Sequence, residues 1–312
     1  MKMWVGAGLI LGMLVGGGWW CFGPVSVKDE PGTFVVPQEQ AGWDTASKLV
    51  EERFIRSQAG FRILSGRTKI ESGGYRLNRN MNVWQVVKKL AGPPDLAWVT
   101  ISYCLRREQI GEILGEKLGW DAKKLDRWNA IGKEGQYYPD TYLVPVDEVV
   151  EVTAQRFFDR FNEKMAPLMD KFLVENILWT TGVKIASLIA RESGGPDDMK
   201  LISGIIWNRL NSDMRLQIDS TMQYTRGKAD GKWWGSIDLA EKRKDSPYNT
   251  YLYKGLPPTP ICSPGIEAIE AAVEPEETDC LFYLHDSSGQ IHCAKTYEEH
   301  VQNIKWYYGS GV

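Results

Sequence analysis

The chain has 312 residues, a formal net charge of −3 and 43% hydrophobic residues. These values are ordinary for a globular protein, and the length accommodates a membrane anchor with two modest domains. The slight negative charge provides no overall basic field, so nucleic acid is excluded as an expected partner.

The first predicted element is an uncharged run from Met3 to Phe22. Its length is close to the ~20 residues that a helix needs to cross a bilayer, and Trp19 and Trp20 stand where interfacial aromatics are expected. Only Lys2 and the amino terminus carry charge before the run, so the positive-inside rule keeps the N-terminus cytoplasmic and exports the remainder. We therefore predict a cytoplasmic tip and transmembrane helix over residues 1–28. A cleaved signal peptide is the alternative, but bulky tryptophans occupy the positions where cleavage requires small residues.

The next region, residues 29–145, contains three short strand-then-helix patterns, which predict a small α+β module. The strands are expected at 34–36, 74–77 and 98–101, and the helices at 43–54, 83–90 and 110–118. Pro139 interrupts an aromatic-rich turn at 137–142, and we place the end of the module just after it.

The last region, residues 146–312, mixes helices with a hairpin, so the fold class is α+β. Helices are expected at 147–165, 183–193, 199–210, 265–273 and 297–308. A loop-rich stretch is expected at 211–265, followed by a hairpin that pairs 281–285 with 291–295.

Metal chemistry is not favoured by the cysteines and histidines. The cysteines outside the apolar run are Cys104, Cys262, Cys280 and Cys293. No Cys-x-x-Cys pair occurs, so a zinc ribbon is not expected. Free buried thiols are expected, and one disulfide among the last three is the alternative in an oxidising compartment. Nothing in the spacing of the three histidines requires them to converge, so no metal site is predicted.

One glutamate lies on the apolar side of a predicted helix. Ile185, Leu188, Ile189 and Glu192 are spaced at i, i+3, i+4 and i+7, which places them on one helix face. Apolar neighbours and the negative end of the helix dipole both raise the pKa of a carboxyl group. A protonated Glu192 could then act as a general acid. The competing interpretation is a structural ion pair with an arginine or lysine.

Several further motifs support the first interpretation. They are Ile185–Ser193, Trp207–Leu210, Met214–Thr221 with Tyr224, Tyr248–Tyr251, Gly255–Pro258, Pro260–Gly265, Phe282–Leu284 with Gly289 and His292, Glu299–His300 and the upstream Pro139–Tyr142. In their order along the chain, these motifs resemble the YceG-like family of endolytic murein transglycosylases, from about residue 30 to 305. Four positions depart from the family pattern: Ala190 replaces a glutamate, Ser220 replaces a proline, and Ser102–Tyr103 replaces a Pro-Glu pair.

The resemblance implies that Glu192 is the single catalytic acid and base, without cofactor or metal. It implies cleavage between N-acetylmuramic acid and N-acetylglucosamine in nascent peptidoglycan strands, which forms 1,6-anhydro ends and terminates strand elongation. The resemblance identifies residues 29–145 as a LysM-like module and residues 146–312 as the catalytic domain, which would lie on the outer side of the cell membrane. Glycan strands are the expected partner, and peptidoglycan synthases are further candidates.

The matched motifs also supply candidate substrate-binding residues: Ser193, Asn208, Gln217, Asp219, Thr221, Tyr224, Tyr248 and Asn249. Loop-fixing hydrogen bonds or core packing are the competing interpretation for the amides and tyrosines. Trp233 and Trp234 are candidates for the floor of a saccharide groove, and Arg209 is expected to pair with a carboxylate such as Asp219 or Glu192. Two other functions stay open: a hydrolytic muramidase, and a membrane-anchored glycan-binding scaffold of the wall synthesis machinery.

Overall fold

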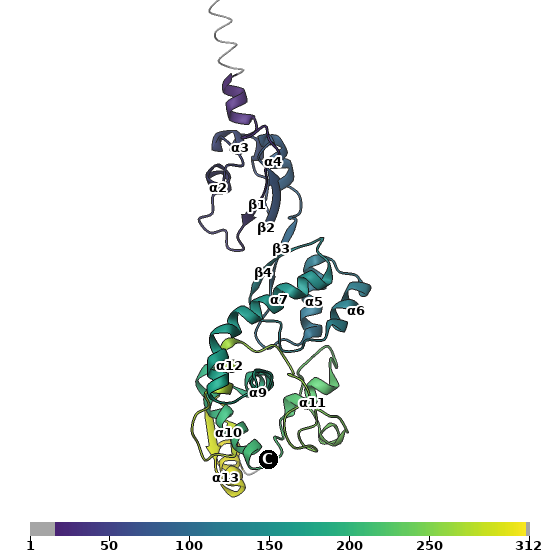
Figure 1. Ribbon diagram of the computed structural model, residues 1–312, viewed down its shortest axis with the longest axis vertical. Helices are drawn as coiled ribbons and strands as arrows, with labels where there is room; N and C mark the ends of the chain where they lie inside the picture. Colours follow the sequence, from purple (N-terminus) through teal and green to yellow (C-terminus); the bar gives the residue numbers. More distant parts are fainter. Residues whose placement is uncertain (1–15, 310–312) are drawn as a thin grey trace, which may run out of the picture. The chain divides into compact units, whose positions relative to one another are not determined.

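The computed structural model describes residues 16–309 and divides into two compact units (Figure 1). Unit 1 consists of the chain up to Val99 with residues 116–119 and 141–148, and unit 2 contains the remainder. Most of the predicted anchor lies outside the described residues. Within 16–309, no single helix combines the length and hydropathy that a bilayer crossing needs; only the pair 150–174 and 179–192, bent by 109°, passes together.

Unit 1 is built on a sheet whose strand order is β1-β2-β3-β4. The strands are β1 (Pro31–Val36), β2 (Gly73–Asn78), β3 (Leu96–Thr100) and β4 (Thr141–Pro145). The helices are α2 (Thr45–Glu51), α3 (Gln58–Ser65) and α4 (Val83–Leu90). β1 and β2 pair antiparallel over their whole length, from Pro31 opposite Asn78 to Val36 opposite Gly73.

The sheet and helices of unit 1 enclose one apolar core. Phe34 and Tyr75 from the sheet pack with Leu49 from α2 and Val86 from α4, and all four are fully buried. The ends of the helices are satisfied locally: Asp44 caps α2, and Asn82 with Gln85 forms a capping box on α4. Burial of the core and capping of the helix ends therefore both favour the same element boundaries.

Unit 2 is mainly helical. Its helices in chain order are α5 (Arg107–Leu118, whose last turn belongs to unit 1), α6 (Ala122–Ile131), α7 (Val150–Met165), α8 (Met169–Val174), α9 (Trp179–Glu192), α10 (Met199–Asn211), α11 (Asp219–Arg226), α12 (Ile266–Val273) and α13 (Tyr297–Tyr308), with short 3₁₀ turns at 166–168, 196–198 and 241–243. A hairpin of β5 (Phe282–His285) and β6 (Ile291–Ala294) precedes α13. The mixed α+β fold class is thus confirmed.

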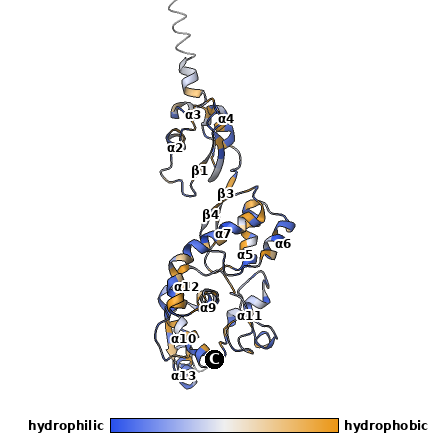
Figure 2. Cartoon of the chain, in the orientation of Figure 1, coloured by the Kyte–Doolittle hydropathy of each residue, from blue (hydrophilic) through white to orange (hydrophobic). Residues whose placement is uncertain are grey.

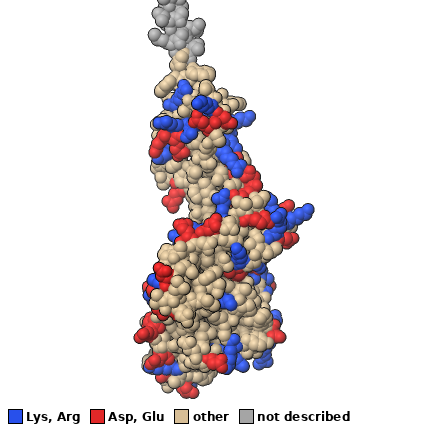
Figure 3. Space-filling view, in the orientation of Figure 1, with Lys and Arg blue, Asp and Glu red and all other residues tan. Residues whose placement is uncertain are grey.

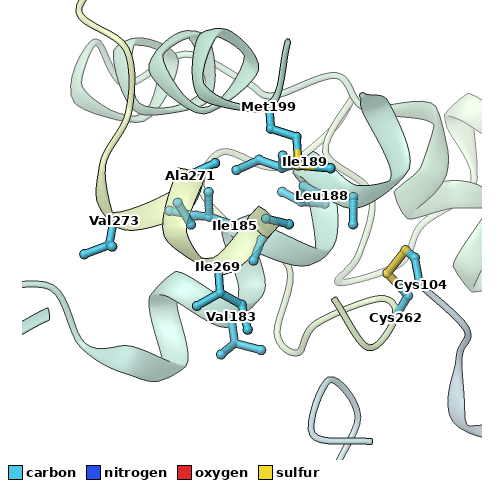
Figure 4. Close-up of a cluster of buried hydrophobic side chains, with 14 of the residues drawn as sticks. Cys104, Val183, Ile185, Leu188, Ile189, Met199, Cys262, Ile269, Ala271 and Val273 are labelled. Carbon is cyan, nitrogen blue, oxygen red and sulfur yellow. A yellow bond between two sulfur atoms is a disulfide. The ribbon is translucent and has the colours of Figure 1, made fainter. Parts of the chain in front are cut away.

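Helix α9 lies at the centre of the core of unit 2 and packs against α10 and α12 (Figure 4). It is buried on nearly all sides because Val183, Ile185, Leu188 and Ile189 cover most of its circumference. Figure 2 shows α12 largely in the colour of hydrophobic residues and the peripheral α6 largely hydrophilic. This packing holds the C-terminal end of α9 in one position.

The expectation of free thiols outside the apolar run is wrong. Two disulfides are present, Cys104–Cys262 and Cys280–Cys293 (the first is drawn in Figure 4), and Cys21 alone is free. The first joins residues 158 positions apart, which sequence spacing could not pair. The second joins Cys293 on the hairpin strand β6 to Cys280, which lies two residues before β5, and so braces the hairpin.

Most predicted elements are present, with shifts of a few residues at their ends. The helices predicted at 83–90 and 297–308 have those bounds in the structure, and the hairpin is confirmed. Five further helices and strands stand where no such element was expected: α3, α6, β4, α8 and α11. The last of these lies within the predicted loop-rich stretch, because Asp219 starts a helix of only two turns.

Candidate active site

The site begins at the last residue of α9. Glu192 closes the helix, and the next residue, Ser193, leaves it with an extended backbone (φ −72°, ψ 141°) while its N–H still donates to the Ile189 carbonyl. The carboxyl therefore projects from the end of a helix that the core holds on nearly all sides. Local sequence supports this geometry because Gly194 and Gly195 follow directly.

Two hydroxyl groups hold the Glu192 carboxyl. Ser220 Oγ, in the first turn of α11, donates to Oε1 at 2.8 Å. Tyr283 OH, on β5, donates to Oε2 at 2.9 Å. Each carboxyl oxygen thus has one donor, and both donors come from elements remote in sequence. This arrangement replaces the structural ion pair that was the competing interpretation.

Burial raises the pKa of Glu192 above its ordinary value of 4.5, because the charged form loses hydration. The hydrogen bonds from Ser220 and Tyr283 lower the pKa and partly oppose this effect, while the nearby Asp219 raises it. Tyr283 itself has a pKa raised well above 10 by burial, so its hydroxyl remains a donor. The site can therefore hold a proton on Glu192 and also accommodate the carboxylate once the proton has left.

Glu192 faces a pocket of about 430 Å³. The pocket is lined by Glu192, Arg209, Leu216, Gln217, Ile218, Asp219, Lys242, Tyr251, Phe282, Tyr283, Tyr297 and His300. Of the residues predicted from sequence, Glu192, Gln217 and Asp219 are brought together here. A volume of this size admits a sugar residue, and the lining offers both aromatic faces and hydrogen-bonding groups.

The carboxylate of Asp219 lines the pocket beside Glu192. Its carboxylate forms an ion pair with Lys242 Nζ at 2.9 Å and accepts a hydrogen bond from the Tyr251 hydroxyl. The neighbouring Gln217 has a left-handed backbone (φ 53°), and its N–H donates to the Thr250 carbonyl. A side chain other than glycine in this conformation costs free energy, and such residues occur preferentially at functional sites.

Three predicted binding residues instead fasten loops. Asn208 donates to the carbonyls of Thr278 and Cys280, and the fully buried Asn249 donates to those of Lys242 and Lys244. Thr221 donates to the Ile218 carbonyl. Ser193, by its position, only ends α9. None of these four lines the pocket around Glu192, so their assignment to substrate binding stays a prediction.

The predicted aromatic residues and Arg209 are also engaged within the protein. The ring of Tyr224 packs on that of Tyr248 with centroids 5.0 Å apart. The guanidinium of Arg106 covers Trp233 at 4.8 Å, and that of Arg191 covers Trp234 at 4.2 Å. These indoles thus stack on cations of the protein itself.

Arg209 does not bind the carboxylates that sequence suggested. It donates to the carbonyls of Leu216 and Leu281 and lies over the ring of Phe282. The expected pairing with Asp219 or Glu192 is therefore wrong: Arg209 ties the segment before α11 to the hairpin. This cation positions the two elements that supply Ser220 and Tyr283.

Sequence reasoning missed Ser220 and Tyr283 as contacts of the acid. A signal existed for both, since Ser220 follows Asp219 directly and Tyr283 lies in a motif already singled out. The sequence could not show that these side chains meet, because Ser220 and Tyr283 are 28 and 91 positions from Glu192 along the chain.

The loop after Glu192 is fixed by Asp198 and His285. Asp198 accepts a hydrogen bond from the Gly194 N–H at 2.8 Å, and His285 Nε2 lies 2.7 Å from the same carboxyl oxygen. His285 and Tyr283 are two positions apart on β5, so one face of a strand contacts both the acid and the loop that follows it. The hairpin therefore orients the catalytic candidate from two points.

Comparison with known proteins places the sequence within a family. Residues 34–306 match the YceG-like family. A crystal structure of a YceG-like protein from Listeria monocytogenes is similar, with a TM-score of 0.59 and 25% sequence identity, over 88% of this chain and all of that one.

Two curated relatives are described as endolytic murein transglycosylases. The one from Bacillus subtilis is 27% identical over 288 residues, which are 82% of this chain and 79% of the relative. The one from Streptococcus pneumoniae is 27% identical over 278 residues, which are 76% of this chain. The chain spans about half the length (50%) of the streptococcal relative.

Proposed function

The chain belongs to the YceG-like family, and from this premise we propose that it is an endolytic lytic transglycosylase of peptidoglycan. The observation that carries the proposal is the carboxyl of Glu192, which faces a pocket and accepts hydrogen bonds from two hydroxyls. The names of the curated relatives support the substrate class. The bond cleaved is the one between C1 of N-acetylmuramic acid and the oxygen of N-acetylglucosamine.

In the proposed reaction, protonated Glu192 gives its proton to the bridging oxygen. The bond from C1 to that oxygen breaks, its electron pair leaves with the oxygen, and positive charge develops at C1. The Glu192 carboxylate then takes the proton of the C6 hydroxyl of the same muramic acid, and O6 bonds to C1. No water is consumed and Glu192 regains its proton. The nucleophile belongs to the substrate, so proximity replaces the second carboxyl group of ordinary glycosidases.

The groups around Glu192 suit both halves of this cycle. Burial raises the pKa of Glu192 and so favours the protonated acid before the bond breaks, and the hydroxyls of Ser220 and Tyr283 stabilise the carboxylate formed afterwards. The Asp219 carboxylate, held by Lys242 and Tyr251, is the group that we assign to offset positive charge at C1. Gln217 and the aromatic side chains of the pocket are assigned to bind the sugars.

We further propose that residues 3–22 anchor the chain in the cell membrane and that unit 2 works outside it, on strands as they are made. The uncharged run and its flanking tryptophans support the anchor. The two disulfides support an oxidising compartment, where such bonds persist. Cutting nascent strands internally would terminate their elongation, which makes peptidoglycan synthases the expected protein partners.

The test is to incubate the full chain in detergent micelles with uncrosslinked glycan strands and to read the product ends by mass spectrometry. We expect 1,6-anhydro ends from the wild type and none from Glu192→Gln, which keeps the shape of the side chain and removes the acid. Reducing ends without anhydro ends would mean that the protein is a hydrolytic muramidase. Strand binding without cleavage by the wild type would favour the glycan-binding scaffold.

A further inference from the structure

Unit 1 exposes a group of large apolar side chains at the start of the described chain. Ile63 on α3 is 71% exposed and Trp84 on α4 is 58% exposed. Trp19, Phe22, Leu64 and Trp84 line a common hollow of about 660 Å³. In Figure 3, the surface where the described chain begins is mostly tan, the colour of uncharged residues. Soluble surfaces seldom expose apolar groups gathered in this way, so the patch points to a partner.

The chain that enters unit 1 is held directly against this patch. Gly60 on α3 packs so closely on residue 21 that an added Cβ would lie 2.4 Å from the Cys21 carbonyl oxygen. Ile63 and Leu64 follow Gly60 at i+3 and i+4, and therefore lie on the same face of α3.

Two hydrogen bonds fix the next residues of the entering chain. The Ser26 N–H donates to the Arg79 carbonyl at 2.9 Å, and Arg56 donates to the Val25 carbonyl at 3.2 Å. The exposed side chains and the end of the uncharged run consequently form one continuous surface.

A cation accompanies the exposed indole on α4. Lys88 follows Trp84 by one helical turn, and its Nζ lies 5.4 Å from the ring centroid. Tryptophan prefers the boundary between hydrocarbon and headgroups, where its ring is apolar and its N–H is polar. A lysine beside it can bury its stem and extend its ammonium group to lipid phosphates. This pairing fits a lipid surface better than a purely apolar partner.

We propose that this lipid-facing patch, formed by Trp19, Trp20, Phe22, Ile63, Leu64, Trp84 and Lys88, lies in the interface of the bilayer that holds the anchor. The occupant follows from the sequence: the uncharged run from Met3 to Phe22 ends within the patch, so lipid that surrounds the run adjoins α3 and α4. The inference rests on the proposed anchor and goes beyond it, because an anchor alone could leave unit 1 free in water. The patch instead seats unit 1 on the membrane surface.

The experiment uses the full chain with Cys21→Ser, which removes the free thiol. One new cysteine is introduced at Ile63, Trp84, Trp19 or Gln40 and is labelled with the fluorophore NBD. Gln40 is the matched control, because it is an exposed residue of unit 1 beside a different hollow. The labelled chains are placed in nanodiscs of phosphatidylcholine and phosphatidylglycerol, with and without lipids that carry a doxyl quencher near the headgroup.

We expect blue-shifted emission and loss of fluorescence to the doxyl lipids at positions 19, 63 and 84, and neither effect at position 40. Quenching at 19 without quenching at 63 and 84 would leave the anchor standing and overturn the patch. Absence of quenching at all three positions would overturn both. Blue-shifted emission at 63 and 84 that doxyl lipids do not quench would show that protein, such as a second copy, covers the patch, and would overturn the lipid assignment.

Discussion

Unit 2 contains two buried carboxyl groups with raised pKa values, and one of them, Glu192, lines a pocket of about 430 Å³. Glu192 ends α9 and opens onto the space lined by Asp219 and Tyr283. Glu134, in the turn after α6, is 5% exposed and accepts hydrogen bonds from the Arg107 N–H at 3.1 Å and from Tyr224 OH at 3.2 Å. Burial raises the pKa of Glu134 to about 7.

The difference between the two groups is access. Burial raises the pKa of both carboxyl groups, and each accepts a hydrogen bond from a tyrosine hydroxyl, that of Tyr224 or Tyr283. The carboxyl oxygens of Glu134 accept hydrogen bonds that join the start of α5 to α11, and the residue is only 5% exposed. A raised pKa shows that the charged form of a group is disfavoured. A catalytic acid needs, in addition, a pocket in which the substrate can reach it.

The largest expected effect is on the rate of strand cleavage, and it should appear when the acid is removed at Glu192 but not when it is removed at Glu134. Glu192→Gln is expected to reduce the rate of strand cleavage by about 10²–10⁴-fold, the contribution typical of a positioned acid or base. Glu134→Gln should leave the rate within a few-fold of wild type, because Glu134 does not line the pocket around Glu192. The measurement is the rate of anhydro-end formation at saturating strand concentration. Equal losses of rate in the two variants would contradict the assignment of Glu192, and not Glu134, as the catalytic acid.

The second prediction concerns stability. The pKa of Glu134 is raised from 4.5 to about 7 on folding, so between these values the folded state binds more protons than the unfolded state. Its contribution to the free energy of unfolding is therefore complete below pH 4.5 and is lost as the pH rises through 7, a change on the order of 3 kcal/mol. Glu134→Gln should remove this decline.

Urea unfolding of wild type and Glu134→Gln at a series of pH values measures this difference. Parallel curves for the two proteins would mean that Glu134 is already ionised in the folded state, and the comparison of two protonated carboxyls would fail.

The smallest effects should come from the hydroxyls that hold Glu192. Tyr283→Phe and Ser220→Ala each remove a hydrogen bond that lowers the pKa of Glu192. The pKa of Glu192 should rise further. Because the carboxylate formed during the reaction loses one stabilising hydrogen bond, cleavage should slow on the order of tenfold, as expected for one hydrogen bond to a charged group. The high-pH limb of the rate profile should move to higher pH.

Tyr253→Phe is the control for these variants, since its hydroxyl binds the exposed Asp245. If Tyr283→Phe lost rate but kept the wild-type pH profile, Tyr283 would act by packing and not through the pKa of Glu192.

Sequence was sufficient for features that depend on local periodicity. The apolar stripe of 185, 188 and 189 predicted both α9 and the position of Glu192 at its end, because helical spacing determines which side chains share a face. The hairpin was predicted from local sequence as well, since the two segments 281–285 and 291–295 flank a short polar turn that contains Gly289.

Features that depend on contacts between distant segments were not available from the sequence. The disulfide Cys104–Cys262 and the hydrogen bond of Tyr283 to Glu192 each join residues about a hundred positions or more apart, and one sequence carries no pairing information at that range. Helix α11 was missed because its two turns are stabilised by tertiary packing of Thr221 and Met222. Motif spacing likewise could not distinguish the pocket-lining Gln217 from the loop-fixing Asn249.

The most direct test is to titrate the carboxyl of Glu192 itself. Protein labelled with ¹³C at glutamate side chains, compared with the Glu192→Gln variant, assigns the carbon-13 signal of this group, which can then be followed from acid to neutral pH by NMR. The account predicts a midpoint above the ordinary value of 4.5, and a higher one still in Tyr283→Phe. A midpoint at or below 4.5 would contradict it, because Glu192 would then be an anion with no proton to give to the glycosidic oxygen.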